Sequence, residues 1–241
     1  MNNFPYDHLI IDNFFPIDKA RKLSQEFPEY DSNLWYQYKN PLENKKSSNN
    51  WWDFPPETYK TFCFLNSCEF LNTLREKTGI QKLYPDIGLH GGGWHIHSRG
   101  GKLNIHLDYS IHPKSGLQRK LNLIVYLTEG WKSEWGGGLE LWSHNADKNL
   151  PLRKEKTIYN VFNRAILFDT TQNSWHGLPQ PLSCPEGVYR KSLAVYYMTD
   201  PPNRVDPRQR ALYAPTEEQS DDKEVLDFIQ QRVLWKGKPK L

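Results

Sequence analysis

Cysteine is scarce in this sequence: three cysteines occur among 241 residues, and none of them forms a Cys-x-x-Cys pair. An odd, unclustered set cannot build the paired framework of a small disulfide-rich protein or supply the thiolates of a structural zinc site. Free cysteine is an ordinary residue in a reducing compartment. We therefore expect Cys63, Cys68 and Cys184 to be free thiols of a cytoplasmic protein.

Long apolar runs and blocks of like charge are also missing. No stretch approaches the length needed to cross a bilayer, and the first residues lack the charged and apolar regions of a signal peptide. The net charge is +3 at pH 7, and basic and acidic residues are interspersed along the chain. We therefore expect a soluble protein that binds neither membranes nor nucleic acid.

Aromatic residues, in contrast, are abundant: they make up 14% of the sequence and include nine tryptophans. Large rings must therefore supply much of the core and of any pocket. Several of these rings fall in residues 29–56, a segment without a clear period. Two interpretations stay open for it: a mobile lid that brings rings to a substrate, or a surface loop pinned by its own aromatic side chains.

The length of the chain suits one substantial hydrophobic core, so we expect a single domain over residues 1–241. Its N-terminal part, residues 1–79, is expected to brace that core. The elements predicted there are a strand at residues 9–15, a helix at 17–27, and two helical pieces within 56–77 that end at Gly79.

Residues from about 80 to 200 have a different sequence pattern, with short alternating segments, glycine-rich turns and aromatic residues. This pattern is typical of an antiparallel sandwich or barrel. The predicted strands are residues 103–109, 121–127, 139–142, 157–162, 165–169 and 191–198, with Asn163 and Arg164 as a two-residue hairpin.

Residues 201–241 are predicted to form a helical extension. Thr216 and Gln219 have the spacing of a capping box, which indicates a helix starting near Thr216. The last residues, 236–241, are expected to be a frayed tail. The whole pattern predicts a mainly β fold with flanking helices.

Within the predicted strand at residues 103–109, His106 and Asp108 lie two positions apart. Side chains alternate along a strand, so the imidazole and the carboxylate point the same way. Such a pair supplies two ligands of the 2-His-1-carboxylate triad, which holds non-haem Fe(II) with positions left open for chemistry. The tripeptide alone is weak, because roughly 0.5 occurrences are expected by chance in this composition.

His176 is the best candidate for the third ligand. It ends a strand-like segment far downstream, where another edge of the same barrel could face His106. His112 follows Asp108 too closely, beyond a predicted turn, and His144 falls in a polar stretch that we interpret as a loop. A lone histidine is more often structural than a ligand, so this assignment depends on a co-substrate anchor nearby.

Arg190 supplies such an anchor at the start of the next predicted strand. Strand alternation places Arg190 on one face with Ser192 and Ala194, so small residues leave room for a ligand beside the guanidinium. The planar fork of arginine grips a carboxylate bidentately, and Ser192 offers a hydroxyl donor. A buried arginine that faces inward needs such an anion.

His106, Asp108, His176 and Arg190 stand in an order that resembles a known family. Over roughly residues 90–200 the chain is similar to the Fe(II)- and 2-oxoglutarate-dependent dioxygenases, in their prolyl 4-hydroxylase-like branch. The resemblance implies a double-stranded β-helix, or jelly roll, with iron at its open end and N-terminal helices bracing it. Further points of similarity are Tyr126-Leu127 at a strand end, Trp131, and the glycines before residue 139.

The resemblance also implies roles for these residues. His106, Asp108 and His176 would bind Fe(II), which works with 2-oxoglutarate and dioxygen, and ascorbate is a candidate reductant. Arg190 would pair with the far carboxylate of 2-oxoglutarate, assisted by Tyr126. The implied reaction hydroxylates an aliphatic C–H, on a prolyl or other amino-acid residue of a protein or peptide, and releases succinate and CO2.

One position departs from the family pattern. Many prolyl hydroxylase-like members carry a tyrosine nine residues before the His of His-x-Asp, and here that position is His97. His97 either takes over the contact with 2-oxoglutarate or is a polar residue at a strand end. This departure leaves proline in doubt as the substrate, because pocket residues and not the fold decide specificity. The alternative function is a non-catalytic jelly-roll module that binds a metal or ligand.

Overall fold

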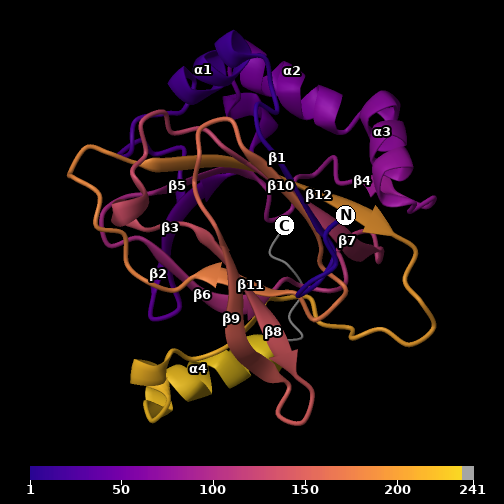
Figure 1. Ribbon diagram of the computed structural model, residues 1–241, viewed down its shortest axis with the longest axis vertical. Coiled ribbons are helices and arrows are strands. Elements are labelled where there is room, and N and C mark those ends of the chain that lie inside the picture. Colours follow the sequence, from indigo (N-terminus) through magenta and orange to yellow (C-terminus); the bar gives the residue numbers. More distant parts are fainter. Residues whose placement is uncertain (235–241) are drawn as a thin grey trace.

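The computed structural model describes residues 1–234, and its main feature is one strongly curled antiparallel sheet (Figure 1). Helices α1 to α3 lie together at one end of the molecule, and α4 lies at the other. The strands are β1 (His8–Ile11), β2 (Tyr36–Asn40), β3 (Glu43–Ser48), β4 (Tyr84–Pro85), β5 (Gly93–His97), β6 (Lys102–Leu107), β7 (Gln118–Tyr126), β8 (Leu139–Asn145), β9 (Leu150–Ile158), β10 (Ala165–Asp169), β11 (Trp175–Leu178), β12 (Arg190–Thr199) and β13 (Leu212–Tyr213). The helices are α1 (Ile17–Gln25), α2 (Pro56–Leu65), α3 (Cys68–Thr78) and α4 (Lys223–Leu234), with 3-10 helices η1 (Trp51–Asp53), η2 (Ser133–Trp135) and η3 (Glu217–Gln219).

The strand order divides the sheet into two halves. The first half runs β1-β10-β7-β12-β5 and the second runs β6-β11-β8-β9, while β3 pairs with both β5 and β6. Side chains from the two halves meet inside the curl. Asn122 of β7 donates to Asp108, which follows β6, and the rings of Phe168 in β10 and His176 in β11 are 4.7 Å apart. This arrangement confirms the predicted mainly β class with a jelly-roll core.

The largest hydrophobic core lies between the first half of the sheet and the N-terminal helices. Leu23 of α1, Phe62 of α2 and Leu71 of α3 pack in the same buried cluster as residues of β5, β7 and β12. On β7 the alternation of side chains is visible in the packing. Leu121, Leu123 and Val125 belong to this outer cluster, whereas Asn122 and Tyr126 face the inside of the curl. The N-terminal helices therefore brace the sheet, as predicted.

The two helical pieces predicted within residues 56–77 are α2 and α3. Gly79 ends α3 in the left-handed conformation, with φ of 75°, and its N–H donates to the carbonyl of Arg75. Glycine reaches this conformation without the steric penalty that a Cβ imposes, which is why the sequence signal was reliable.

The prediction of an irregular loop at residues 29–56 is wrong. This segment contains the β2–β3 hairpin, and β3 joins the core sheet by pairing with β5 and β6. The core therefore does not begin near residue 80. The sequence of β3, Glu-Asn-Lys-Lys-Ser-Ser, has no apolar alternation. Polar contacts, and not apolar packing, hold this strand in place. Lys46, for example, donates to the carbonyl of Tyr30 and lies over its ring.

The predicted hairpin at Asn163 and Arg164 is wrong. β9 pairs with β8, whereas β10 pairs with β1 and β7, so the connection crosses from one half of the sheet to the other. Asn163 has a positive φ of 62°, and its side chain both accepts from the N–H and donates to the carbonyl of Phe15. Long-range anchoring to the N-terminal segment thus determines this turn.

The C-terminal part is only partly helical. The capping box of Thr216 and Gln219 is present, but it opens η3, and α4 begins later at Lys223. Ahead of both, β13 pairs with β6, a strand that the sequence did not indicate. The tail predicted at residues 236–241 lies outside the described residues.

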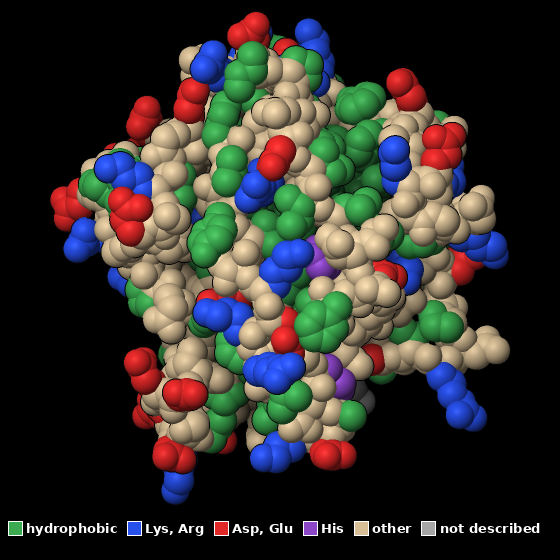
Figure 2. Space-filling model, in the orientation of Figure 1, with side chains coloured by type: hydrophobic (Ala, Val, Ile, Leu, Met, Phe, Trp, Pro, Cys, Tyr) green, Lys and Arg blue, Asp and Glu red, His purple; other side chains and the backbone are tan. Residues whose placement is uncertain are grey.

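None of the helices within residues 1–234 is long and apolar enough to cross a membrane. Lysine, arginine, aspartate and glutamate side chains lie interspersed over the face in Figure 2, as their mixing along the sequence predicts.

Candidate active site

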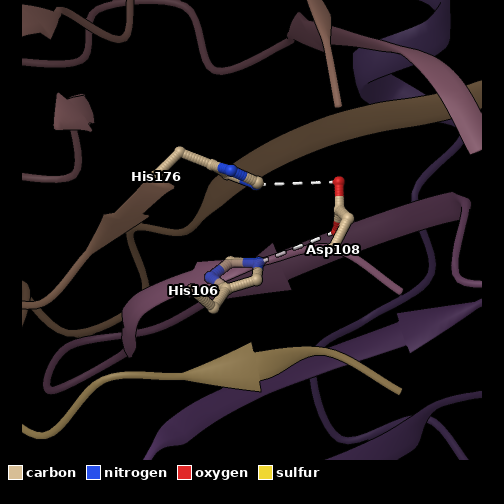
Figure 3. Close-up of side chains that lie close together, drawn as sticks. All are labelled: His106, Asp108 and His176. Atoms are coloured by element: carbon tan, nitrogen blue, oxygen red, sulfur yellow. Dashed lines mark ion pairs between the residues drawn. The ribbon is translucent and has the colours of Figure 1, made fainter. Parts of the chain in front are cut away.

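The side chains of His106, Asp108 and His176 meet inside the curled sheet (Figure 3). β6 and β11 are antiparallel neighbours, and their register sets His106 directly opposite His176. Asp108 follows β6 and turns toward both rings. Its two carboxylate oxygens each lie 3.8 Å from one imidazole Nε2, and the three ligand atoms lie within 4.8 Å of one another. The structure therefore brings together all three residues of the predicted triad.

Gly177 explains how the two histidine strands approach so closely. A Cβ at this position would lie 2.7 Å from the carbonyl oxygen of Leu103 and 2.8 Å from that of Asn104. Backbone atoms cannot give way as a flexible side chain can, so only glycine fits between the strands. The close approach of β6 and β11 therefore requires glycine at position 177.

Hydrogen bonds fix the tautomers of both histidines. Nδ1 of His106 lies 2.9 Å from the carbonyl oxygen of Asn104, and Nδ1 of His176 lies 2.8 Å from that of Ser174. A carbonyl can only accept, so each Nδ1 must carry the proton and donate it. Each Nε2 therefore turns an unprotonated lone pair toward Asp108.

Burial and charge make this a set of electron-pair donors. The residues His106, Asp108 and His176 are 5%, 8% and 3% exposed. Burial lowers the pKa of His106 to about 3 and also lowers the pKa of His176, so both rings are neutral at pH 7. Burial alone would raise the pKa of Asp108, but the charge of Arg119 and the hydrogen bond from Asn122 hold it below its usual range. Two lone pairs and a carboxylate facing one point fit a divalent cation.

Sequence reasoning missed two residues that hold the carboxylate. Nδ2 of Asn122 donates to Asp108 over 3.2 Å, and Nη1 of Arg119 lies 3.2 Å from the other oxygen. Arg119 is itself buried between the rings of Tyr109 and Tyr196, each 3.3 Å from its guanidinium carbon. The signal in the sequence was the presence of these two polar residues in a strongly apolar strand. A bulge in the β7–β12 pairing removes the regular two-residue spacing that would have placed them on one face.

A second cluster lines the inside of β5, β7 and β12. Across the sheet, Arg190 lies opposite His97, and Ser192 lies opposite both Tyr126 and His95. Directly opposed residues of antiparallel strands share a face, so the four predicted co-substrate residues lie together on the inner face. The guanidinium carbon of Arg190 is 4.9 Å from the centre of the Tyr126 ring, and its Nε donates to the carbonyl of Gly137.

This second cluster has unused hydrogen-bonding capacity. Arg190 is 3% exposed and forms no ion pair with a residue of the described chain. Within residues 1–234, both ring nitrogens of His97 have no hydrogen-bond partner, and the Tyr126 hydroxyl interacts with the guanidinium of Arg190. Burial raises the pKa of Tyr126 and lowers the pKa of His97, which keeps both groups neutral. A buried cation beside the unpaired ring nitrogens of His97 fits a carboxylate ligand.

The two histidines rejected from the sequence have other partners. Nε2 of His112 lies 3.5 Å from Asp86, and Nδ1 of His144 accepts from the indole of Trp175. His144 lies on β8 and not in a loop, so the reason given for rejecting it was wrong, although the triad forms without it.

The curled sheet, the buried triad and the buried Arg190 fit a class of metal-dependent oxygenase. Residues 92–198 match the family model described as the 2OG-Fe(II) oxygenase superfamily. The match includes the strands that carry the triad and Arg190, and it supports a 2-oxoglutarate-dependent dioxygenase with Fe(II) as its metal and 2-oxoglutarate and dioxygen as co-substrates. No curated protein matches the sequence.

Solved structures share the fold at low identity. A prolyl-4-hydroxylase from Pseudomonas putida matches with a TM-score of 0.55 and 15% identity, covering 80% of this chain and 92% of its own. A prolyl hydroxylase from Trichoplax adhaerens, in complex with a hypoxia inducible factor peptide fragment, gives 0.56 and 17%, covering 80% and 83%. HygX from Streptomyces hygroscopicus, with nickel and 2-oxoglutarate bound, gives 0.55 and 13%, covering 80% and 82%.

Proposed function

We propose that the protein hydroxylates an aliphatic C–H of a prolyl or other amino-acid residue in a protein or peptide. His106, Asp108 and His176 hold the Fe(II), and Arg190 pairs with the far carboxylate of 2-oxoglutarate. Tyr126, Ser192 and His97 complete the pocket for that carboxylate. The observation that carries the proposal is the buried Arg190, which has no ionic partner in the described chain and lies opposite the unpaired His97 ring.

When bound, the iron supplies the oxidation in which dioxygen and 2-oxoglutarate give succinate and CO2 while one oxygen atom enters the substrate C–H bond. The chain's residues prepare the site for this reaction. The carbonyls of Asn104 and Ser174 keep both imidazoles in the tautomer that can bind a metal. Arg119 and Asn122 keep Asp108 ionised, and burial of all three ligands excludes water from the site.

The substrate class rests on similarity to prolyl hydroxylases, one of them in complex with a peptide. Another solved structure of the same fold, HygX, has hygromycin B bound, and its TM-score is 0.50. A substrate screen should therefore include amino acids and small polar molecules beside peptides. We expect a proline-containing peptide to give the strongest succinate release and a mass gain of one oxygen atom.

The metal assignment is tested by removing each ligand side chain. His106→Ala, Asp108→Ala and His176→Ala should each abolish Fe(II)-dependent succinate formation, measured with the substrate found in the screen. Asp147→Ala, in the exposed turn between β8 and β9, is the matched control and should keep wild-type turnover. Full turnover in any of the three ligand variants would refute the assignment.

The co-substrate assignment has a different signature. Arg190→Ala should raise the 2-oxoglutarate concentration needed for half-maximal rate strongly, because loss of one partner of a buried charge pair costs about 2–5 kcal/mol. Metal binding should persist in this variant, since Arg190 contacts none of the three ligands in the described interactions. An unchanged 2-oxoglutarate requirement would contradict the role of Arg190.

A further inference from the structure

The C-terminal residues return to the strand that carries His106. β3 pairs with the first half of β6, where Glu43 and Asn44 lie opposite Leu103 and Lys102. Beyond that point β13 takes over, with Tyr213 directly opposite His106. All of β13 lies after residue 198, where the match to the superfamily model ends. The half of β6 that bears the candidate ligand therefore depends on a strand outside the matched region.

Backbone contacts from the residues around β13 also reach Asp108. The N–H of Ala214 donates to the carbonyl of Ile105, and the carbonyl of Arg208 accepts from the N–H groups of Ser110 and Ile111. The guanidinium of Arg208 donates over 2.7 Å to the backbone carbonyl of Asp108. The chain from residue 208 to 214 thus lies alongside both β6 ligands.

Tyr213 contacts the imidazole itself. Its ring is stacked on that of His106, with centroids 5.1 Å apart and an interplanar angle of 27°. Tyr213 is 4% exposed, and its hydroxyl donates over 3.1 Å to Oε2 of Glu43. Glu43 is 1% exposed and lies on β3, next to β6. The ring that touches the ligand is therefore held at its far end by a buried carboxylate.

The charge of Glu43 is balanced by two cations. Nη2 of Arg232, on α4, lies 3.6 Å from Oε1, and Nζ of Lys45 lies 3.5 Å from Oε2. The guanidinium of Arg232 also lies over the ring of Tyr213, 5.1 Å from its centre. Because an unpaired buried carboxylate is costly, these contacts link α4 to the position of Tyr213.

We propose that residues 208–232, the C-terminal strap, hold His106 in place for the metal, with Tyr213 as the positioning residue. The inference rests on the proposed role of His106 as a metal ligand. The strap acts through the stacked ring and through the hydrogen bond from Tyr213 to Glu43. Its loss leaves all three ligand side chains present, but the His106 ring then keeps its hydrogen bond to the Asn104 carbonyl and loses the stacked ring that restricts its orientation.

Co(II) binding to the metal-free full-length protein tests the strap. Calorimetry gives the Co(II) affinity, and the visible absorption of bound Co(II) reports ligand geometry. Tyr213→Leu should weaken Co(II) binding about 10- to 100-fold, the usual effect of removing a residue that orients a metal ligand. Tyr213→Phe and Glu43→Gln keep the ring or the shape of the carboxylate, and each should cause a smaller, several-fold loss with an altered Co(II) spectrum.

Tyr159→Leu replaces an exposed tyrosine away from the strap and should bind Co(II) like the wild type. Wild-type affinity and spectrum in Tyr213→Leu, Tyr213→Phe and Glu43→Gln would overturn the inference. If Tyr213→Leu does not fold, the other two variants decide. Absence of Co(II) binding by the wild type would instead refute the metal centre, and with it the proposed function.

Discussion

At the scale of single residues, the cluster around Arg190 keeps polar atoms buried without a partner. The two ring nitrogens of His97 are such atoms. A buried polar group without a hydrogen bond destabilises the folded protein, so such groups are rare in structures unless a ligand pairs with them. We interpret these atoms as groups held ready for the carboxylate of 2-oxoglutarate.

His97→Phe separates a binding role from a structural one. The variant removes both unpaired nitrogens and keeps an aromatic ring, so the free energy of unfolding of the ligand-free protein should stay equal or rise. The 2-oxoglutarate concentration needed for half-maximal rate should rise about tenfold, as expected for a lost hydrogen bond to a charged group. Denaturant unfolding and co-substrate titration measure the two effects.

Thr61→Val provides the matched control, because the Thr61 hydroxyl is also buried without a partner but lies on α2. It should leave the 2-oxoglutarate requirement unchanged. A normal requirement in His97→Phe would show that His97 is a polar residue at a strand end, the second interpretation drawn from the sequence.

At the scale of elements, prediction succeeded where local chemistry determines the structure. The apolar alternation of β7 and β12 and the glycine at the end of α3 are local signals, and they gave those elements correctly. β3 was missed because its polar sequence is held by pairing with two distant strands. Arg119 was missed for the same reason: only the folded β7–β12 pairing brings it to Asp108.

For the candidate site too, local signals were predictable and contacts between distant segments were not. Strand alternation placed His106 with Asp108 and Arg190 with Ser192, whereas His176 was chosen from its place at a downstream strand end and from the family resemblance. The structure brings His106, Asp108 and His176 together. The support around Asp108 and His106 could not be predicted, because it comes from elements far apart in the sequence. The single-domain boundary and the cytoplasmic location stay predictions.

Gly177→Ala tests the close approach of β6 and β11. The added methyl would collide with backbone carbonyls of β6, so β11 must shift and His176 with it. We expect the free energy of unfolding to fall by about 1–3 kcal/mol, the usual cost of overpacking. Co(II) affinity should fall as well, which calorimetry can measure.

Gly88→Ala is the matched control for this substitution. A Cβ at Gly88 would meet its nearest atom, Oδ1 of Asp86, at 3.5 Å, an ordinary contact distance. Its stability and Co(II) affinity should stay close to wild type. If Gly177→Ala behaves like Gly88→Ala, the spacing of the two histidine strands does not depend on the glycine.

At the scale of the whole molecule, most histidines are held in their neutral form. Burial lowers the pKa of six of the eight, and His90 and His95 are lowered to about 4 and about 3. A histidine whose pKa is lower in the folded state binds protons more readily when unfolded. Acid therefore favours the unfolded chain.

The free energy of unfolding of the metal-free protein should consequently decrease as pH falls from 7 to 5, through the ordinary histidine pKa near 6.5. Urea unfolding at a series of pH values measures this slope. His95→Gln removes one such group while keeping a donor for the carbonyl of Gly91, so its slope should be shallower than that of the wild type. Parallel slopes would argue that His95 is not kept neutral by the fold.

The pairing of β6 with β11 also bears on when the proposed metal site can form. During synthesis His106 and Asp108 leave the ribosome well before His176, and the strand that supports them from the far side, β13, is made later still. Contacts between residues so distant in sequence form late in folding. On the proposed ligand assignment, a nascent chain carries two of the three ligands until β11 is made, so we expect Fe(II) to bind only after β6 and β11 have paired.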